Sequence, residues 1–537
     1  MTTNKVERIV IVGGGSAGWM TAAYLNKAFG KSTQISVLES PNISTVGVGE
    51  ATFSTIKLFF DFLELDEQDW MPECSGSYKL AIKFVGWNAQ NKHFYHPFQR
   101  QEVIDGFNIG EWWLKHRDSL NAYDYSCFTV PKLCDSNRSP RYLDGTVYDS
   151  KVDAHFKRDS SFGKNMLTDL KIQFPYAYHF NASQLASFLR KLAVKNGVKH
   201  IEDEVVDVKL SEDGSIGGLL TKEHGEVTGD LFIDCTGFKG LLINKALKEP
   251  FISFSDSLLC DTAIAMQIPR DIEKDGMKPY TTATALKSGW VWNIPLYGRD
   301  GTGYVFSSQF VTVEDAEKEF RAHLGCSSVN VNASVIKMRI GRNRNAWVKN
   351  CVGIGLANAF VEPLESTGIF FIQHAIEELV AAFPNKAFAP ELVKRYNKTI
   401  SECIDGVKDF LTLHYYASNR KDTPFWKATK TEIKISDELR NHLNEWSQVL
   451  PNSRNVNQRY HGFESYSYAV MLQGLGFLPD CSLPVLNHLD SRNALEGFKK
   501  IGERASFLCD SLPSQYEYLT ALQKKSERSG PYSRQLI

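Results

Sequence analysis

The sequence predicts an α/β fold that begins with a βαβ unit. Residues 8–12, Arg-Ile-Val-Ile-Val, form a β-branched run that is typical of a buried parallel strand. A glycine-rich turn over residues 13–18 breaks this run, and a helical pattern follows as far as Phe29. A second apolar run over residues 34–38 ends in Glu39 and completes the unit.

Strands and helices continue to alternate along the rest of the chain. The patterns predict a helix over 56–65, an alternating strand over 79–85, a helix over 184–196, a strand-turn-strand over 198–220 and a buried strand over 230–234. Further on they predict antiparallel strands over 258–310, a strand over 351–356, a helix over 368–383 and mostly helical structure over 390–525.

The segment from about 90 to 175 differs from its surroundings. It is rich in aromatic residues, Asp, Ser and Pro, and its weak periodicity predicts an inserted, loop-rich segment. We therefore divide the chain into residues 1–390, which carry this insertion, and a mostly helical part, residues 391–537, packed on them.

Composition and charge are those of an ordinary globular protein. The 537 residues are 43% hydrophobic and 23% charged, and 61 basic and 62 acidic residues leave a net charge of -1. This balance predicts no binding to nucleic acid, and no run of ~18 apolar residues predicts a membrane span. The ten cysteines include no Cys-x-x-Cys pair and no zinc-like Cys/His spacing. We therefore expect reduced thiols, no metal and a cytoplasmic protein.

The glycine-rich turn matches Gly-x-Gly-x-x-Gly in the context that dinucleotide binding requires. It follows a strand, opens a helix and precedes a strand that ends in Glu39, 21 residues after Gly18. Glycines let the backbone approach a pyrophosphate, the helix N-terminus favours its charge, and the Glu39 carboxylate can accept both ribose hydroxyls. The predicted nucleotide-binding residues are Gly13, Gly14, Gly15, Ser16, Ala17, Gly18 and Glu39.

Two later segments favour FAD over NAD. Residues 231–237, Leu-Phe-Ile-Asp-Cys-Thr-Gly, resemble the strand and turn of FAD-dependent monooxygenase folds that pass near the nucleotide. Residues 353–357, Gly-Ile-Gly-Leu-Ala, resemble the later strand-to-helix turn beside the flavin. This resemblance implies a monooxygenase-like FAD module, a mixed-sheet substrate region and a mostly helical C-terminal part. Further FAD contacts are expected at Gly49, Ala51, Val205 and Leu356.

A tryptophan motif, Trp290-x-Trp292-x-Ile294-Pro295, lies in the predicted antiparallel strands. On a strand the two tryptophans share one face and Pro295 ends the strand, so two core tryptophans are the structural alternative. The motif resembles the signature of the FAD-dependent halogenases. In that family the segment lies near the flavin and obstructs oxygen insertion into the substrate.

Other segments resemble the tryptophan halogenases across essentially the whole chain. They are residues 47–53, 78–80, 94–98, 174–180 and 362–369. Three segments look most like the tryptophan 5-halogenase branch, namely residues 53–55, 105–108 and 460–464.

The resemblance assigns the central chemistry to Lys79. On the predicted strand Lys79 shares a face with Ala81 and Lys83, and a pair of surface lysines is the structural alternative. In the halogenases the matching lysine meets hypohalous acid at the end of an internal tunnel, where it hydrogen-bonds the acid or forms a chloramine. An ammonium is a compact donor, and burial lowers its pKa and frees the amine.

Four consecutive residues carry the remaining reaction groups that the resemblance implies. Glu365 fits the acidic first turn of a helix, but the family pattern makes it the partner of Lys79, which orients the electrophile or takes the ring proton. Ser366 links this site to the flavin side. Thr367 and Gly368 offer backbone N–H groups at a helix N-terminus, which predicts a halide site, although an ordinary helix start has the same features.

The resemblance also implies a planar indole substrate, which the inserted segment would face. His96 and Phe98 match the family residues that sandwich the indole, and Phe53 is a further wall, with ordinary core aromatics as the alternative. The candidates for holding the polar end of an amino acid are Gln173, Tyr460, Phe463 and Glu464.

Together these motifs predict a two-component, FAD-dependent halogenase that chlorinates or brominates free L-tryptophan at C5. A separate NAD(P)H-dependent reductase supplies FADH2, O2 and chloride or bromide are co-substrates, and homodimers are common in the family. No second Gly-x-Gly-x-x-Gly follows a strand, so we expect no stable NAD(P)H site. A tryptophan 6- or 7-halogenase, or a halogenase of another indole, is the alternative within the family. A flavin monooxygenase that inserts oxygen and a non-catalytic flavin-binding protein are the alternatives from other classes.

Overall fold

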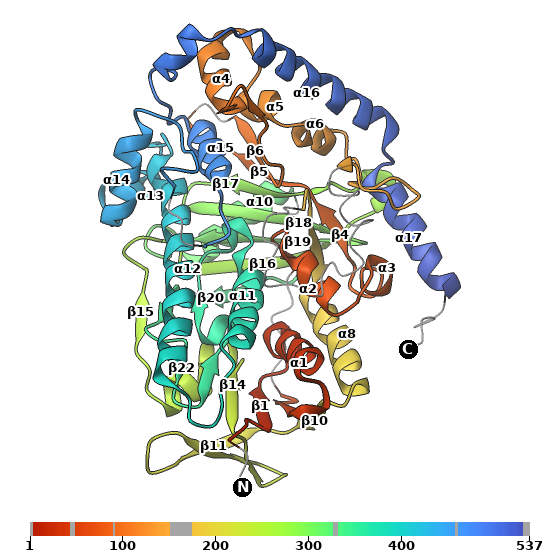
Figure 1. Ribbon diagram of the computed structural model, residues 1–537, viewed down its shortest axis with the longest axis vertical. Helices are drawn as coiled ribbons and strands as arrows, with labels where there is room; N and C mark the ends of the chain where they lie inside the picture. The colour runs from red at the N-terminus through yellow and green to blue at the C-terminus, as the bar shows by residue number, and fades with distance from the viewer. Residues whose placement is uncertain are drawn as a thin grey trace.

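The structure is a computed structural model of the chain. It describes residues 4–42, 49–89, 92–150, 174–325, 331–456 and 460–529. Figure 1 shows the N-terminus beside β1 at one end of the molecule and helix α16 across the opposite end.

A six-stranded sheet contains the predicted βαβ unit. Its order is β10-β2-β1-β14-β23-β22, and every neighbouring pair is parallel except β23 with β22. The strands are β10 (Lys199–Glu202), β2 (Gln34–Glu39), β1 (Arg8–Val12), β14 (Leu231–Asp234), β23 (Cys351–Gly353) and β22 (Trp347–Val348). Helix α1 (Ser16–Phe29) joins β1 to β2 and packs against α8 (Ala182–Lys195) and α11 (Thr367–Ala381). The glycine-rich turn therefore lies at the carboxyl edge of the parallel strands, where such sheets bind ligands.

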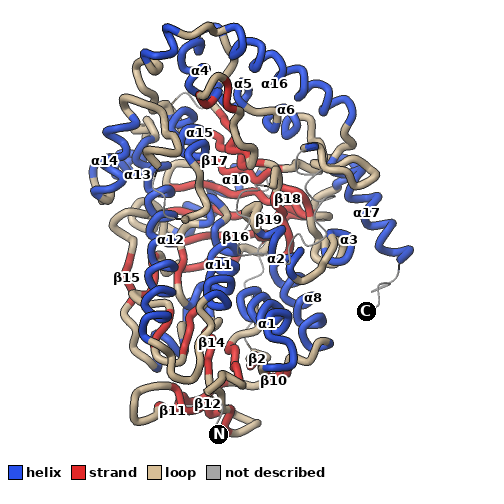
Figure 2. The backbone as a smooth tube through the Cα atoms, in the orientation of Figure 1, coloured by secondary structure: helices blue, strands red, loops and turns tan. Residues whose placement is uncertain are grey.

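A seven-stranded mixed sheet lies beyond the first one, and Figure 2 shows its strands crossing the middle of the molecule. Its order is β20-β16-β19-β18-β17-β5-β6, with β17 and β5 parallel and all other neighbours antiparallel. The strands are β20 (Ser334–Lys337), β16 (Thr262–Pro269), β19 (Arg299–Phe306), β18 (Gly289–Leu296), β17 (Tyr280–Ala285), β5 (Ala81–Val85) and β6 (His93–Pro97). The mixed-sheet region predicted from the sequence is confirmed.

Four smaller sheets lie in the described part of the chain. In one of them β9 (Ala177–Asn181) lies between β3 (Gly49–Ala51) and β4 (Ser77–Lys79), which brings residues 49–52 close to Lys79. A second sheet contains β11 (Val205–Leu210), β12 (Ile216–Thr221) and β13 (Glu226–Val227). A third contains β15 (Phe251–Ser253), β21 (Gly341–Asn343) and β24 (Ala359–Phe360). The fourth pairs β7 (Val103–Ile104) with β8 (Phe107–Asn108).

The C-terminal part is mostly helical, as predicted. It contains α12 (Pro390–Ala417), α13 (Pro424–Thr431), α14 (Asp437–Trp446), α15 (Ser465–Leu475), α16 (Arg492–Ser511) and α17 (Gln515–Ser529). Helix α12 packs along α11, and the predicted division at residue 390 coincides with its first residue. The division itself stays a prediction. Within the described residues, no helix has both the length and the apolar character needed to cross a membrane.

The inserted segment is less irregular than its sequence predicts. Between residues 92 and 150 it forms β6 and three short helices, α4 (Ile109–His116), α5 (Tyr123–Cys127) and α6 (Val130–Asp135). All three helices pack under α16, as Figure 1 shows. Helices this short carry too few turns for a clear 3.6-residue pattern, and packing stabilises them. Residues 151–173 of this segment lie outside the described residues.

Three local predictions are wrong. The strand predicted over 79–85 is two strands, because the chain turns into a different sheet at Leu80, whose N–H donates to the Pro279 carbonyl over 2.7 Å. Lys79 and Lys83 therefore do not share a face. The helix predicted over 56–65 ends earlier, as α2 (Ile56–Phe62). Pro295 does not end its strand, because β18 continues to Leu296. β17 pairs with β18 only as far as Asn293, so this edge of β18 is open at Pro295, where a residue without an N–H is tolerated.

The described residues also form three further α-helices. They are α3 (Glu67–Trp70), α9 (Ile272–Asp275) and α10 (Val313–Leu324).

Candidate active site

The glycine-rich turn forms a tight cradle after β1. Gly13 has φ 114°, and a Cβ there would lie 2.3 Å from the carbonyl oxygen of Cys235. A Cβ on Gly14 would overlap the carboxyl group of Glu39, and one on Gly18 would lie 1.8 Å from the Gly13 carbonyl oxygen. Since any larger residue would close this space, the turn keeps its backbone N–H groups accessible to a phosphate.

Glu39 ends β2 beside this turn. Its Oε2 lies 2.9 Å from Nε2 of His200, and the His200 ring meets Trp19 edge-on with centroids 5.2 Å apart. The carboxylate is thus held where the sequence predicts a ribose. The sequence analysis did not identify His200, because its only signal is its place on the neighbouring strand.

The remaining predicted FAD contacts lie on several elements. Gly355 and Leu356 belong to a 3-10 turn, η5 (Gly355–Ala357), and a Cβ on Gly355 would lie 3.0 Å from the Ala17 Cβ. Gly15 is the N-cap of α1, and Ser16 is the first residue of that helix, with its Oγ donating to the Ala182 carbonyl. Gly49 and Ala51 lie on β3, and Val205 begins β11. The glycine cradle, the helix N-terminus and Glu39 fit the pyrophosphate and ribose of FAD.

Lys79 is fully buried at the end of β4. Its Nζ donates to Oγ of Ser366 over 2.8 Å and to the carbonyl of Thr52 over 3.1 Å, and it lies 5.1 Å from the centroid of the Phe98 ring. Burial lowers the pKa of Lys79 to about 7, against the opposing effect of the Glu365 charge. The surface-lysine alternative is therefore wrong for Lys79.

Glu365 ends a 3-10 turn, η6 (Pro363–Glu365), and is 2% exposed. Both carboxylate oxygens lie 3.1 Å from Nδ1 of His96, and Oε1 lies 2.9 Å from Nε2 of His414. Burial raises the pKa of this carboxyl, but the two histidines outweigh it and lower the pKa to about 2. Glu365 is thus an ionised carboxylate. The next residue in the chain, Ser366, accepts the hydrogen bond from Lys79.

The start of α11 follows directly. Ser366 takes the left-handed conformation with φ 62°, which turns the chain from η6 into the helix. Oγ1 of Thr367 is buried without a hydrogen-bond partner among the described residues, and a Cβ on Gly368 would meet nothing within 4 Å. The first turn of α11 therefore has free space beside Gly368, and N–H groups at a helix N-terminus are donors of the kind that an anion site uses.

A cavity of about 500 Å³ lies beside Glu365. Its lining includes six of the seven residues predicted to hold a substrate, namely Phe53, His96, Phe98, Tyr460, Phe463 and Glu464. The seventh, Gln173, lies outside the described residues. The Phe53 ring lies 5.1 Å from those of both Phe370 and Phe463. Aromatic walls of this kind suit a flat ring.

The rim of this cavity carries an ion pair that the sequence analysis missed. Nε of Arg100 lies 2.9 Å from Oε2 of Glu464, and both side chains are 42% exposed. Nothing in the spacing of residues 100 and 464 indicates that they meet.

Trp290 and Trp292 share one face of β18, with ring centroids 6.3 Å apart, as the strand pattern predicts. Nε1 of Trp290 donates over 3.0 Å to the buried carboxyl of Glu362, which also accepts from the Tyr415 hydroxyl. Burial raises the pKa of Glu362 to about 7. The tryptophan motif is therefore bonded to the turn that carries Glu365. Ile294 and Pro295 continue the same strand.

Comparison with known proteins identifies the chain. The family model described as tryptophan halogenase matches residues 8–491. The tryptophan 6-halogenase SttH of Streptomyces toxytricini is 48% identical over 522 residues, which cover 97% of this chain and 99% of SttH. The 7-chloro-L-tryptophan 6-halogenase KtzR of Kutzneria sp. (strain 744) is 47% identical over 515 residues, with 96% and 99% covered.

Solved structures agree with these sequence matches. The crystal structure of SttH superposes with a TM-score of 0.91 at 48% identity and covers 96% of this chain and 100% of its own. The tryptophan C-6 flavin-dependent halogenase Tar14, from taromycin biosynthesis, gives a TM-score of 0.90 at 47% identity, with 96% and 100% covered.

The fold and the site thus define a flavin-dependent oxidoreductase with a dinucleotide cradle and a separate, buried lysine and carboxylate. More narrowly, the chain belongs to the tryptophan halogenase family and is a flavin-dependent halogenase. Its co-substrates are reduced FAD from a separate reductase, a halide and O2.

Proposed function

We propose that the protein chlorinates or brominates free L-tryptophan at C6 of the indole. The observation that carries the proposal is the buried Lys79, with Nζ 2.8 Å from Ser366 Oγ and 5.1 Å from the centroid of Phe98, a ring that lines the aromatic cavity together with Glu365. SttH, KtzR and Tar14 are all named as 6-halogenases, which favours C6.

The C5 position predicted from the sequence is not supported by these relatives. That prediction depended on three short segments, residues 53–55, 105–108 and 460–464. Two of the three contribute to the cavity wall. Which ring carbon is attacked depends on how the indole lies in the whole cavity, so short segments are a weak guide to it.

The chain's own residues then have distinct roles in the proposal. Reduced FAD, with O2 and halide, supplies hypohalous acid when bound at the glycine cradle. The backbone N–H groups of Thr367 and Gly368 hold the halide beside the open space at the start of α11. Lys79 holds the electrophile by a hydrogen bond, and Ser366 and the Thr52 carbonyl fix the position of its Nζ.

The substrate end of the site supplies position and a base. His96, Phe98, Phe53 and Phe463 enclose the indole, while Tyr460, Glu464 and Gln173 hold the amino acid end in this proposal. Glu365 accepts the ring proton as the halogen replaces it, because it is ionised and borders the cavity. The tryptophan motif is not an acid or base here, and Trp290 supports the turn that carries Glu365.

The test is a complete reaction with a flavin reductase, NADH, FAD, chloride and L-tryptophan, followed by mass spectrometry and NMR of the product. We expect 6-chlorotryptophan. A product substituted at C5 or C7 would overturn the position and keep the enzyme class. A hydroxylated tryptophan would overturn halogenation itself.

A further inference from the structure

His414 is a buried histidine in the last turn of α12 with both ring nitrogens engaged. Its Nδ1 lies 2.7 Å from the carbonyl oxygen of Phe410, and its Nε2 lies 2.9 Å from Oε1 of Glu365. No sequence motif identified it, and the family resemblance assigned it no role. The inference below rests on the proposed function, in which Glu365 accepts the ring proton.

The two hydrogen bonds constrain the protons on His414. A carbonyl oxygen only accepts, so the proton toward Phe410 is carried by Nδ1. The contact between Nε2 and Oε1 needs a second proton, carried either by the imidazole or by the carboxyl. His96 Nδ1, 3.1 Å from both oxygens, adds a second contact that favours the carboxylate when it donates. This geometry fits an imidazolium next to a carboxylate.

The surroundings of His414 are aromatic. Its ring packs among Phe84, Trp87 and Phe410, with centroid distances of 5.5, 6.3 and 4.9 Å. Within the described part of the chain, Glu365 is the only charged side chain bonded to His414. A buried charge in an aromatic pocket is tolerated only with a well-placed partner, so the charged form of either group depends on the other.

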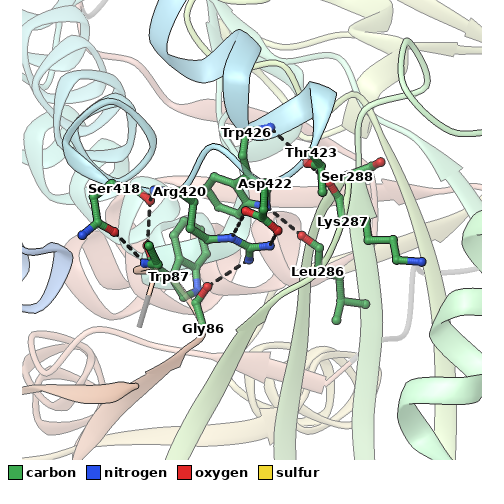
Figure 3. A network of polar contacts seen from close by, with 12 residues as sticks. Gly86, Trp87, Leu286, Lys287, Ser288, Ser418, Arg420, Asp422, Thr423 and Trp426 are labelled. Carbon is green, nitrogen blue, oxygen red and sulfur yellow. Dashed lines mark hydrogen bonds and ion pairs between the residues drawn. The ribbon is translucent and has the colours of Figure 1, made fainter. Parts of the chain in front are cut away.

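The end of α12 is fixed in place by the network in Figure 3. Oγ of Ser418 donates to the Trp87 carbonyl over 2.7 Å, and Nη1 of Arg420 donates to the Gly86 carbonyl over 2.9 Å. Next to His414, the Tyr415 hydroxyl donates to Glu362. Helix α12 thus contacts both Glu362, which precedes the η6 turn, and Glu365, which ends it.

We propose that His414 is a positioning residue that holds Glu365 as a carboxylate and occupies its Oε1. This leaves Oε2, whose partner is His96 at the cavity wall, as the oxygen that receives the ring proton. In that step the C–H bond of the halogenated carbon breaks, its electron pair restores the aromatic ring, and the proton moves to Oε2. The imidazolium of His414 keeps both of its protons throughout.

The first test compares three variants in steady-state halogenation and FAD titration. His414→Phe removes both hydrogen bonds, and we expect kcat to fall ~100-fold or more, with KM for tryptophan and the affinity for FAD within about threefold. His414→Gln keeps one amide donor toward Glu365 without the charge, and we expect partial rescue, to within ~10-fold of wild type. Thr412→Val is the matched control, since Thr412 is buried on the same helix and, among the described residues, its hydroxyl bonds only to the Lys408 carbonyl.

Two results would overturn the proposal. One is a kcat of His414→Phe within twofold of wild type. The other is a loss of FAD affinity and a rise in KM that match the loss of kcat in both His414 variants, which indicates a structural role only.

The second test does not depend on turnover. NMR of the protein labelled with 15N in its histidine rings, with His414→Gln for assignment, reports the protons on His414 directly. We expect both ring nitrogens to be protonated in the substrate-free enzyme, and a neutral ring would overturn the proposal. If the wild-type enzyme fails to halogenate tryptophan, the proposed function fails while this measurement still decides the state of His414.

Discussion

At the residue scale, Lys79 shows how burial creates the chemistry of the site. Its Nζ is removed from water but keeps two oxygen partners, from Ser366 and Thr52, so the ammonium is held without a direct ion pair. The resulting pKa of about 7 means that a part of the population carries a free amine at neutral pH. A surface lysine has neither property.

Replacing Lys79 with Met separates the role of this side chain in halogenation from the effect of its buried charge on stability. We expect Lys79→Met to abolish halogenation while the affinity for FAD stays within about twofold, because the glycine cradle is untouched. We also expect a higher thermal midpoint at pH 7, because the variant buries no ammonium.

The pH dependence of the difference in thermal midpoint between the wild type and Lys79→Met follows from the lowered pKa of Lys79. Between pH 7 and the ordinary lysine range, the folded wild type releases the proton and the unfolded chain keeps it. Wild-type stability therefore rises relative to Lys79→Met, by up to ~1.4 kcal/mol per pH unit, and the gap in thermal midpoint narrows from pH 7 to 9. A gap that widens over this range would contradict the assigned pKa shift.

At the scale of elements, the βαβ turn depends on close backbone approach. Gly18 lies in the first turn of α1, where a Cβ would be 1.8 Å from a backbone oxygen that has no freedom to move. Gly502 lies inside α16, and a Cβ there would meet nothing within 4 Å. Both glycines lie in helices, but their packing is opposite.

This contrast gives a matched pair of variants. We expect Gly18→Ala to lower the thermal midpoint and to weaken FAD binding at least ~10-fold, because the turn must open to relieve the overlap. Gly502→Ala should raise the midpoint slightly, since alanine favours a helix interior by about 1 kcal/mol over glycine. Flavin fluorescence titration and thermal melts measure both, and normal FAD binding by Gly18→Ala would remove the cradle from the nucleotide site.

At the scale of the whole molecule, the end of α12 connects the helical C-terminal part to the seven-stranded sheet. Arg420 bonds to the Gly86 carbonyl after β5, pairs with Asp422, and lies 4.5 Å from the Trp426 ring of α13. Trp426 donates in turn to the Leu286 carbonyl after β17 (Figure 3). The network therefore fixes the end of α12 relative to the ends of β5 and β17 in the seven-stranded sheet.

Arg420→Ala tests this connection. We expect a loss of roughly 1–2 kcal/mol, seen as a lower thermal midpoint, because a nearly buried guanidinium loses its carbonyl and ring contacts. We also expect a larger relative effect on kcat than on FAD affinity, since α12 bonds directly to Glu365 of the η6 turn through His414. Arg492→Ala is the control, because Arg492 makes a similar pair with Asp490 but is 89% exposed. An equal effect of the two substitutions would contradict the anchoring role.

The sequence alone determined the parts of the fold that depend on local pattern. The βαβ unit, the long helices α8 and α11, and the strand after residue 230 follow from periods of 2.0 and 3.6 residues and from glycine chemistry. The FAD prediction, the family, and the candidate roles of Lys79 and Glu365 also came from the sequence, through contiguous motifs.

Only the tertiary structure decided what depends on residues distant in the chain. The break at Leu80, the short helices under α16, and the meeting of Arg100 with Glu464 have no local signal, because long-range packing produces them. His414 lies 49 residues after Glu365 and entered the site only when α12 packed along α11. The position attacked on the indole also has no local signal in the sequence, because it depends on the shape of a cavity whose walls come from distant segments.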